Sequence, residues 1–149
     1  MKKTAFIPAL LITAMLVSGC SSASSGENKD LIIPLETITE TASFYPVTVD
    51  GTKMEVLAVL DSSGNVRTAF NTCESCYDSG NGRYTADGTE IVCGNCGFRF
   101  SADEVGIQTG RGGCNPYPIT DADRIITDSG VEIPYEFLKA SKDIFAEWG

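Results

Sequence analysis

Cysteine is the residue type whose spacing in this 149-residue chain points most directly to chemistry. Four of the six cysteines form two Cys-x-x-Cys pairs, Cys73/Cys76 and Cys93/Cys96, with 16 residues between the pairs. Two residues between cysteines let one tight turn direct both sulfurs to a common point, and a hairpin between the pairs would bring the two turns together. Four thiolates arranged in this way can surround one metal ion, with sulfur about 2.3 Å from zinc. The spacing predicts a metal or iron–sulfur centre at these four residues.

A fifth cysteine, Cys114, lies in an expected loop that contains two glycines and two prolines, residues 112–119. A backbone shaped by glycines and prolines is typical of a loop that holds a side chain in a fixed position. Cys114 is therefore a further candidate metal ligand, or a residue that lines the site. The alternative is a small buried thiol in an irregular loop. The sequence leaves both interpretations open.

Two other interpretations of the Cys-x-x-Cys pairs compete with the metal centre. The cysteines could form structural disulfides, which persist in oxidising compartments. They could also belong to a thiol–disulfide oxidoreductase, whose Cys-x-x-Cys motif begins a helix that lowers the thiol pKa. Gly97, directly after the second pair, permits the positive φ that such a turn often needs. A short strand follows Gly97, and a glycine-rich segment, residues 78–82, follows the first pair. Because neither sequence resembles a helix start, the pattern favours a metal or electron carrier over an enzyme.

Composition excludes several classes of function. The chain contains no histidine, which rules out Ser-His-Asp and Cys-His catalysis, a Cys₂His₂ zinc site, a Rieske cluster and a histidine-ligated haem. It has 11 Lys and Arg against 20 Asp and Glu, a formal net charge of −9. We therefore expect no nucleic-acid partner, because phosphate recognition needs a basic surface.

The N-terminus has the pattern of a bacterial lipoprotein signal. Two lysines, an apolar run over residues 5–17 and the sequence Ser18-Gly19-Cys20 resemble a signal peptide that ends in a lipobox. We divide the chain into a signal peptide (1–19), a lipidated Cys20 with a serine-rich linker (20–30) and a cysteine-rich metal-binding domain (31–149). Acyl chains on Cys20 would anchor the protein to membrane lipid on the extracytoplasmic face.

The elements that must position the cysteines predict an α+β fold, a small β-rich domain with a C-terminal helix. Asp50-Gly51 and residues 86–88 are typical of hairpin turns, and the second of these hairpins would connect the two cysteine pairs. The whole unit would be a two-knuckle cysteine hairpin of the zinc-ribbon or rubredoxin type. The expected helix covers residues 134–148, with its apolar side chains packed on the sheet. The expected strands cover residues 31–38, 42–49, 53–60, 66–70, 83–85, 89–92, 125–127 and 131–133.

Aromatic residues flank both pairs: Tyr77 follows the first, and Phe98 and Phe100 follow the second. They could shield a metal centre from water. Packing in the hydrophobic core is the interpretation we favour for all three rings.

Taken together, these segments are similar to the membrane iron–sulfur-containing FtrD-like proteins of bacteria. The resemblance covers roughly residues 40–120. It is carried by Ala-Phe-Asn-Thr-Cys-Glu-Ser-Cys-Tyr (69–77), Gly-Arg-Tyr (82–84), Ile-Val-Cys-Gly-Asn-Cys-Gly-Phe-Arg-Phe (91–100), Gly106 and Gly-Gly-Cys-Asn-Pro (112–116).

This resemblance implies a cysteine-ligated iron centre on the outer side of the membrane, associated with an iron permease and able to pass electrons to a redox partner. Cys73, Cys76, Cys93 and Cys96 would be its ligands, with Cys114 a ligand or neighbour. Many members of the family carry membrane-spanning helices before this domain, and here a lipid anchor would replace them. If the thiolates held zinc instead, the domain would be a structural zinc-ribbon-like interaction module without redox activity.

Overall fold

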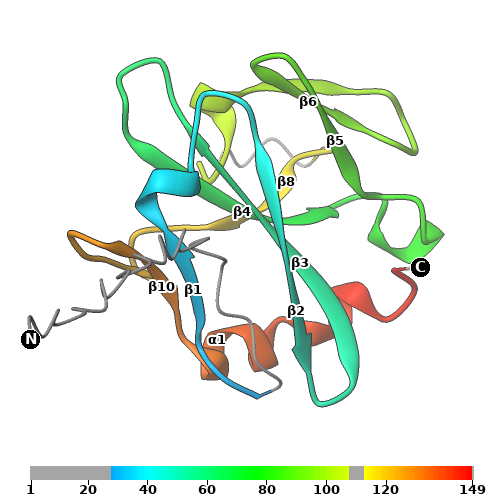
Figure 1. Ribbon diagram of the computed structural model, residues 1–149. Helices are drawn as coiled ribbons and strands as arrows, with labels where there is room; N and C mark the ends of the chain where they lie inside the picture. The colour runs from blue at the N-terminus through cyan, green and yellow to red at the C-terminus, as the bar shows by residue number, and fades with distance from the viewer. Residues whose placement is uncertain (1–27, 108–112, 149) are drawn as a thin grey trace, which may run out of the picture.

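The computed structural model describes residues 28–107 and 113–148, which fold into three antiparallel sheets with one short α-helix near the C-terminus (Figure 1). The sheets have the strand orders β2-β3-β4-β8, β1-β10-β9 and β5-β6-β7. Their strands are β1 Leu31–Pro34, β2 Ser43–Val49, β3 Thr52–Leu60, β4 Val66–Cys73, β5 Tyr84–Asp87, β6 Glu90–Cys93, β7 Arg99–Ser101, β8 Pro116–Ile119, β9 Ile125–Ile126 and β10 Gly130–Ile133. The α-helix is α1 Tyr135–Ala140, and 3₁₀ turns are η1 Leu35–Thr37, η2 Tyr77–Ser79, η3 Ala102–Glu104 and η4 Lys142–Phe145. The prediction of a small β-rich domain is confirmed.

The central sheet begins with the expected β2–β3 hairpin. Val49 pairs with Thr52 across the turn, and both turn residues have positive φ, 48° at Asp50 and 81° at Gly51. This is the backbone conformation of a two-residue type I′ turn, which suits the twist of antiparallel strands. The Asp-Gly pair thus sets the register of the strand that crosses the middle of the domain.

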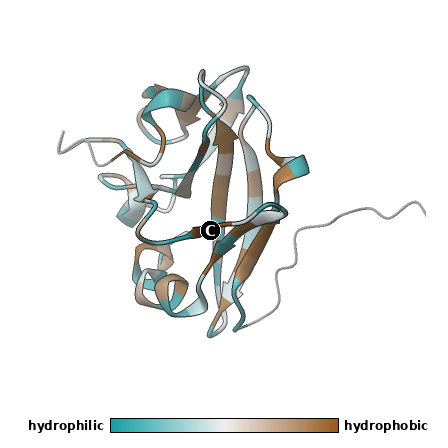
Figure 2. Cartoon of the chain, turned by 90° about the vertical axis from the view of Figure 1, so that its left-hand side faces the viewer, coloured by the Kyte–Doolittle hydropathy of each residue, from teal (hydrophilic) through white to brown (hydrophobic). Residues whose placement is uncertain are grey.

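Strand β3 is almost continuously apolar because both faces of the central sheet are covered. Side chains alternate along a strand, so Val56 points into one core and Leu57 into the other, and both are fully buried. The first core lies against β1, β10 and the C-terminal helix, and the second lies against the β5-β6-β7 sheet. Figure 2 shows hydrophobic residues concentrated along the central strands. The second core contains Cys73, Cys76 and Cys93.

Strand β8 corrects one expectation, since residues 116–118 were expected in a loop. Pro116 and Pro118 instead lie in a strand that pairs with β4, opposite Cys73 and Ala69. A proline cannot donate a backbone hydrogen bond, but it is tolerated at a sheet edge, and β8 is an edge strand. The register shifts between Phe70 and Cys73, so β4 has an irregularity immediately before the first cysteine pair.

The C-terminal helix is shorter than expected. The α-helix ends at Ala140, and η4 follows it in place of a continuous helix over 134–148. Ser141 explains the break: its backbone N–H bonds the carbonyl oxygens of both Phe137 and Leu138, and its hydroxyl donates to Phe137 O at 3.0 Å. The expected core packing is confirmed, because Leu138 and Phe145 are buried against the central sheet.

The predicted signal peptide and Cys20 lie outside the residues that the structure describes, so the lipid anchor stays a prediction. Across residues 28–107 and 113–148, no helix has the length and apolar character needed to span a bilayer.

Candidate metal centre

The first Cys-x-x-Cys pair forms a tight turn at the end of β4. The Cys76 N–H donates to the Cys73 carbonyl at 3.2 Å, and η2 begins directly afterwards. The Cys76 carbonyl in turn accepts from the Ser79 hydroxyl at 2.6 Å and from the Ser79 N–H at 3.1 Å. We call residues 73–76 the first knuckle. Its backbone is held on both sides, so the directions of its two sulfurs are fixed.

The second pair forms a matching turn at the end of β6. The Gly97 N–H donates to the Cys93 carbonyl at 2.9 Å, and the Cys93 N–H donates to the Phe98 carbonyl at 2.9 Å. Gly97 has a φ of 71°, which confirms the expected left-handed conformation that glycine adopts without strain. We call residues 93–97 the second knuckle. The predicted hairpin, β5–β6, connects the two knuckles, with its turn at residues 88–89 where residues 86–88 were expected.

The five predicted cysteines of the domain converge, although they span 41 positions from Cys73 to Cys114. The sulfurs of Cys73, Cys76 and Cys93 lie within 4.8 Å of one another, and so do those of Cys76, Cys96 and Cys114. Cys76 belongs to both groups. All five are free thiols, so the alternative of structural disulfides finds no support in the described residues.

The spacing of the sulfurs suits a metal ion bound by thiolates. In a regular tetrahedron with metal–sulfur bonds of about 2.3 Å, neighbouring sulfurs are about 3.8 Å apart. The Cys76 and Cys114 sulfurs lie 3.8 Å apart. The residues present therefore fit a thiolate-bound metal or iron–sulfur centre, with one more sulfur than a four-coordinate ion requires.

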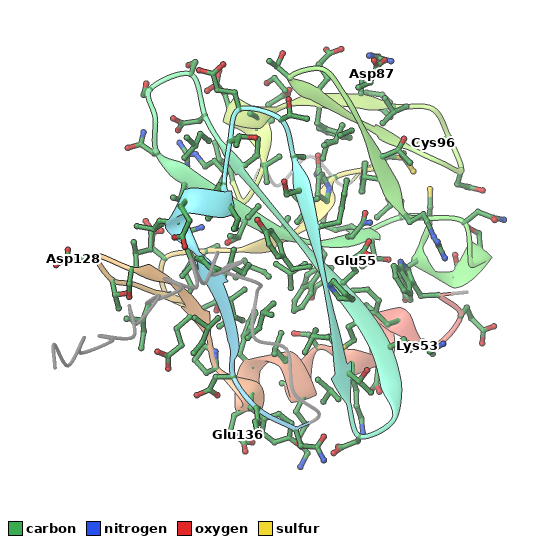
Figure 3. The ribbon with its side chains drawn as sticks, viewed as in Figure 1. Lys53, Glu55, Asp87, Cys96, Asp128 and Glu136 are labelled. Carbon is green, nitrogen blue, oxygen red and sulfur yellow. The ribbon has the colours of Figure 1, made fainter. Side chains whose placement is uncertain are left out.

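The five thiols differ in how deeply they are buried. Cys73, Cys76 and Cys93 are buried, Cys114 is half-buried and Cys96 is exposed. Burial raises the pKa of Cys93 to about 12 and also raises the pKa of Cys76. Hydrogen bonding between Cys114 and Cys96 lowers the pKa of Cys96 and raises that of Cys114. These directions favour the thiolate form at the exposed Cys96, which is labelled in Figure 3.

Two contacts dock the segment around Cys114 onto the first knuckle. The Ser75 hydroxyl donates to the Gly113 carbonyl at 2.8 Å, and the Glu74 N–H donates to the Asn115 carbonyl at 2.9 Å. These bonds come from the two residues between Cys73 and Cys76. Of the two interpretations that the sequence left open, this placement supports a positioned thiol beside the centre.

A buried polar network behind the cysteines was not anticipated from the sequence. The Tyr84 hydroxyl donates to the Cys114 carbonyl, and the Tyr84 N–H donates to Asn71 Oδ1 at 2.6 Å. The Asn71 side chain also donates to Glu55 Oε2 at 2.6 Å, and the Asn71 carbonyl accepts from Trp148 Nε1 at 2.9 Å. Asn71 is only 1% exposed. An asparagine within an apolar strand, two residues before a cysteine, was the signal that could have pointed to it.

The favoured interpretation of the flanking aromatic residues is right for one ring and wrong for two. Phe100 is buried, whereas the Tyr77 and Phe98 side chains are 41% and 60% exposed. Phe98 lies just before β7, which begins at Arg99, so its ring is not held in the core by the pairing of that strand.

The comparisons with known proteins agree with this centre. Residues 38–145 match the family described as "Membrane iron-sulfur containing protein FtrD-like", and this segment runs from the end of η1 to the end of η4 and includes all five converging cysteines. No curated protein and no solved structure matches the chain. Because the match covers most of the sequence and the described thiols converge as a metal centre requires, the chain belongs to the FtrD-like family of membrane iron–sulfur-containing proteins.

Proposed function

We propose that this protein is a membrane-tethered, extracytoplasmic electron carrier that serves bacterial iron transport. Its centre would be an iron–sulfur cluster or a thiolate-bound iron. The observation that carries the proposal is the convergence of five free thiols in a chain of an iron–sulfur family. A centre of this kind gains or loses one electron when bound, and its potential depends on charge, hydrogen bonds to the sulfurs and exposure to solvent.

The residues that would hold the centre are Cys73, Cys76 and Cys93 on the core side, with Cys96 and Cys114 toward solvent. Three buried thiols and a hydrophobic second core exclude water from one side of the site. The exposed Cys96 leaves the other side open. This asymmetry supports an electron carrier, because an electron must pass between the centre and a partner at the surface.

The tether belongs to the same proposal. Diacylation of Cys20 would hold the protein at the membrane, where the permease of an iron-uptake system would be its neighbour. Labelled fatty acid should be incorporated into the wild-type chain, and Cys20→Ser should abolish labelling and release the protein from the membrane fraction. The lipid anchor at Cys20 would be contradicted if the Cys20→Ser variant stayed in the membrane fraction. It would also be contradicted if that variant still incorporated the labelled fatty acid.

The test of the centre is anaerobic purification of the full chain in detergent, followed by absorption spectroscopy and analysis of iron, zinc and acid-labile sulfide. We expect visible charge-transfer bands that a reductant bleaches, with stoichiometric iron. Cys93→Ser should abolish these bands. A colourless protein with stoichiometric zinc would overturn electron transfer and support the zinc-ribbon-like module. Metal-free protein with oxidised cysteines would overturn both and support the disulfide chemistry of an oxidoreductase.

A further inference from the structure

Exposed residues beside the two knuckles lie close together where the Cys96 sulfur reaches solvent. Every residue from 77 to 79 and from 94 to 99 is exposed. These segments are adjacent because the Cys76 and Cys96 sulfurs lie within 4.8 Å of each other. We call residues 77–79 and 94–99 the knuckle face. Cys96, labelled in Figure 3, lies on it beside the β5–β6 hairpin.

The knuckle face presents two aromatic rings to solvent. Phe98 is 60% exposed, the highest value among the exposed large hydrophobic side chains of the described residues, and Tyr77 is 41% exposed. Phe98 follows Cys96 by two residues, and Tyr77 follows Cys76 directly. Exposed aromatic rings next to a functional group are typical anchors of a protein interface.

Phe98 is also held in place by the rings behind it. Its centroid lies 5.3 Å from that of Phe100, and Phe100 packs edge-on against Tyr84 at 6.0 Å. Tyr84 is buried and bonds the Cys114 carbonyl. A supported ring loses little conformational freedom on binding, so its contact with a partner costs less entropy than that of a free side chain.

The charges around this face are mainly acidic. Asp78 is exposed on this face, two residues beyond Cys76. At the start of β7, the guanidinium of Arg99 is bound by both Asp87, at 2.6 Å, and Glu90, at 2.8 Å, on the β5–β6 hairpin, which leaves an excess of one negative charge. The described face therefore complements a basic partner.

We infer that the knuckle face, with Phe98 as its anchor, is the docking surface for a redox protein that presents a basic surface around its own electron-transfer group. The inference rests on the proposed function and names the partner class of the same site. Such encounters are weak and transient, and opposite charges accelerate them at low salt. The exposed Cys96 would be the point of closest approach.

The experiment measures both binding and electron transfer with a basic cytochrome c as the probe and an acidic flavodoxin as the probe of opposite charge. Binding of each probe to the full anaerobically purified chain gives a Kd that does not depend on turnover. In the transfer reaction, the chemically reduced protein loses one electron, and the ferric haem of the cytochrome gains it and becomes ferrous. No bond is made or broken and no proton is transferred.

The variants test the aromatic anchor and the surface charge separately, and the controls test for effects of any surface substitution. Phe98→Ala should weaken binding of the cytochrome about tenfold. Asp78→Asn should weaken it about two- to fivefold at low salt, and less at high salt. The matched controls are Ile125→Ala, 53% exposed on β9, and Asp128→Asn. Asp128 lies far from Cys96 in Figure 3. The controls should bind and react as the wild type does.

The outcomes distinguish this inference from the proposed function. If a small dye oxidises and reduces the centre, but the control variants weaken cytochrome binding as much as the knuckle-face variants, the docking surface is wrong while the electron carrier stands. If the flavodoxin bound more tightly than the cytochrome, the inference that the partner is basic would be wrong. A protein that no dye reduces or oxidises would overturn the proposed function itself.

Discussion

The hydroxyl of Tyr84 donates a hydrogen bond to the backbone carbonyl of Cys114, across 30 residues of sequence. This bond joins the β5–β6 hairpin to the segment that precedes β8. The same tyrosine is attached through its backbone N–H to Asn71 on β4. One buried residue therefore ties together the three parts of the chain that supply cysteines.

We expect Tyr84→Phe to lower the free energy of unfolding by about 1 kcal/mol, because one hydrogen bond is lost and the ring is kept. The metal centre should also change, since Cys114 loses its fixed position. The measurements are urea unfolding and the absorption spectrum of the metal-loaded protein. Tyr45→Phe is the matched control, because the Tyr45 hydroxyl is also buried and bonds Thr37, away from the cysteines. An unchanged spectrum in Tyr84→Phe, or an equal change in Tyr45→Phe, would contradict this role.

The substitution Cys114→Ser tests the fifth thiol. We expect it to lower metal affinity about 10- to 100-fold, as the loss of a group that contacts the ligands commonly does. Cys73, Cys76, Cys93 and Cys96 would still provide four sulfurs. Competition with a chelator measures the affinity. If the variant bound metal with wild-type affinity, Cys114 would be only a packed thiol. If it lost the metal completely, as expected for Cys93→Ser, Cys114 would be an essential ligand.

Gly82 lies so close to the first knuckle that no side chain fits. A Cβ atom there would be 2.8 Å from the Cys76 carbonyl oxygen and 3.1 Å from the Tyr77 nitrogen, both of them backbone atoms. We expect Gly82→Ala to destabilise the fold by about 1–3 kcal/mol and to weaken metal binding, because the knuckle must move.

Gly88 offers the comparison for this substitution. It has a φ of 65° in the β5–β6 turn, with open space where a Cβ would lie. Gly88→Ala should cost about 1 kcal/mol through backbone strain alone and leave metal affinity unchanged. Thermal unfolding and chelator competition measure both effects. Equal metal affinities for the two variants would show that the contact at Gly82 does not position Cys76.

Asp61 should make the stability of the protein sensitive to acid. Burial alone would raise the pKa of this carboxyl, but hydrogen bonds from Asn65, Ser63 and Arg67 outweigh it and lower the pKa to about 2. A carboxyl whose pKa is lowered by folding stabilises the protein above its unfolded pKa. That contribution is lost as the pH falls from about 3.9 toward about 2.

We therefore expect Asp61→Asn to be less stable than the wild type at neutral pH, and the difference to shrink below pH 4. Chemical unfolding at a series of pH values measures this, with the exposed Asp128→Asn as the control. A difference that stays constant down to pH 2 would mean that the charge of Asp61 is not the cause.

The local features of the site could be predicted from the sequence. The β2–β3 turn, the conformation of Gly97 and the hairpin between the cysteine pairs all appear in the structure as expected. Each depends on interactions within a few residues, which residue type and spacing specify directly. The length of the C-terminal helix did not follow in this way, because the apolar pattern continues past Ser141 while the backbone hydrogen bonding changes there.

The arrangement of these parts was decided by tertiary structure. Cys114 meets Cys76 because β8 pairs with β4, although the sequence predicted a loop there. The exposure of Phe98 and the burial of Asn71 likewise follow from how the β5-β6-β7 sheet lies on the central sheet. The sequence alone determined which residues can bind a metal and which local turns present them. Packing between distant segments determined which sulfurs meet and which face solvent, because side-chain burial depends on neighbours that no short stretch of sequence contains.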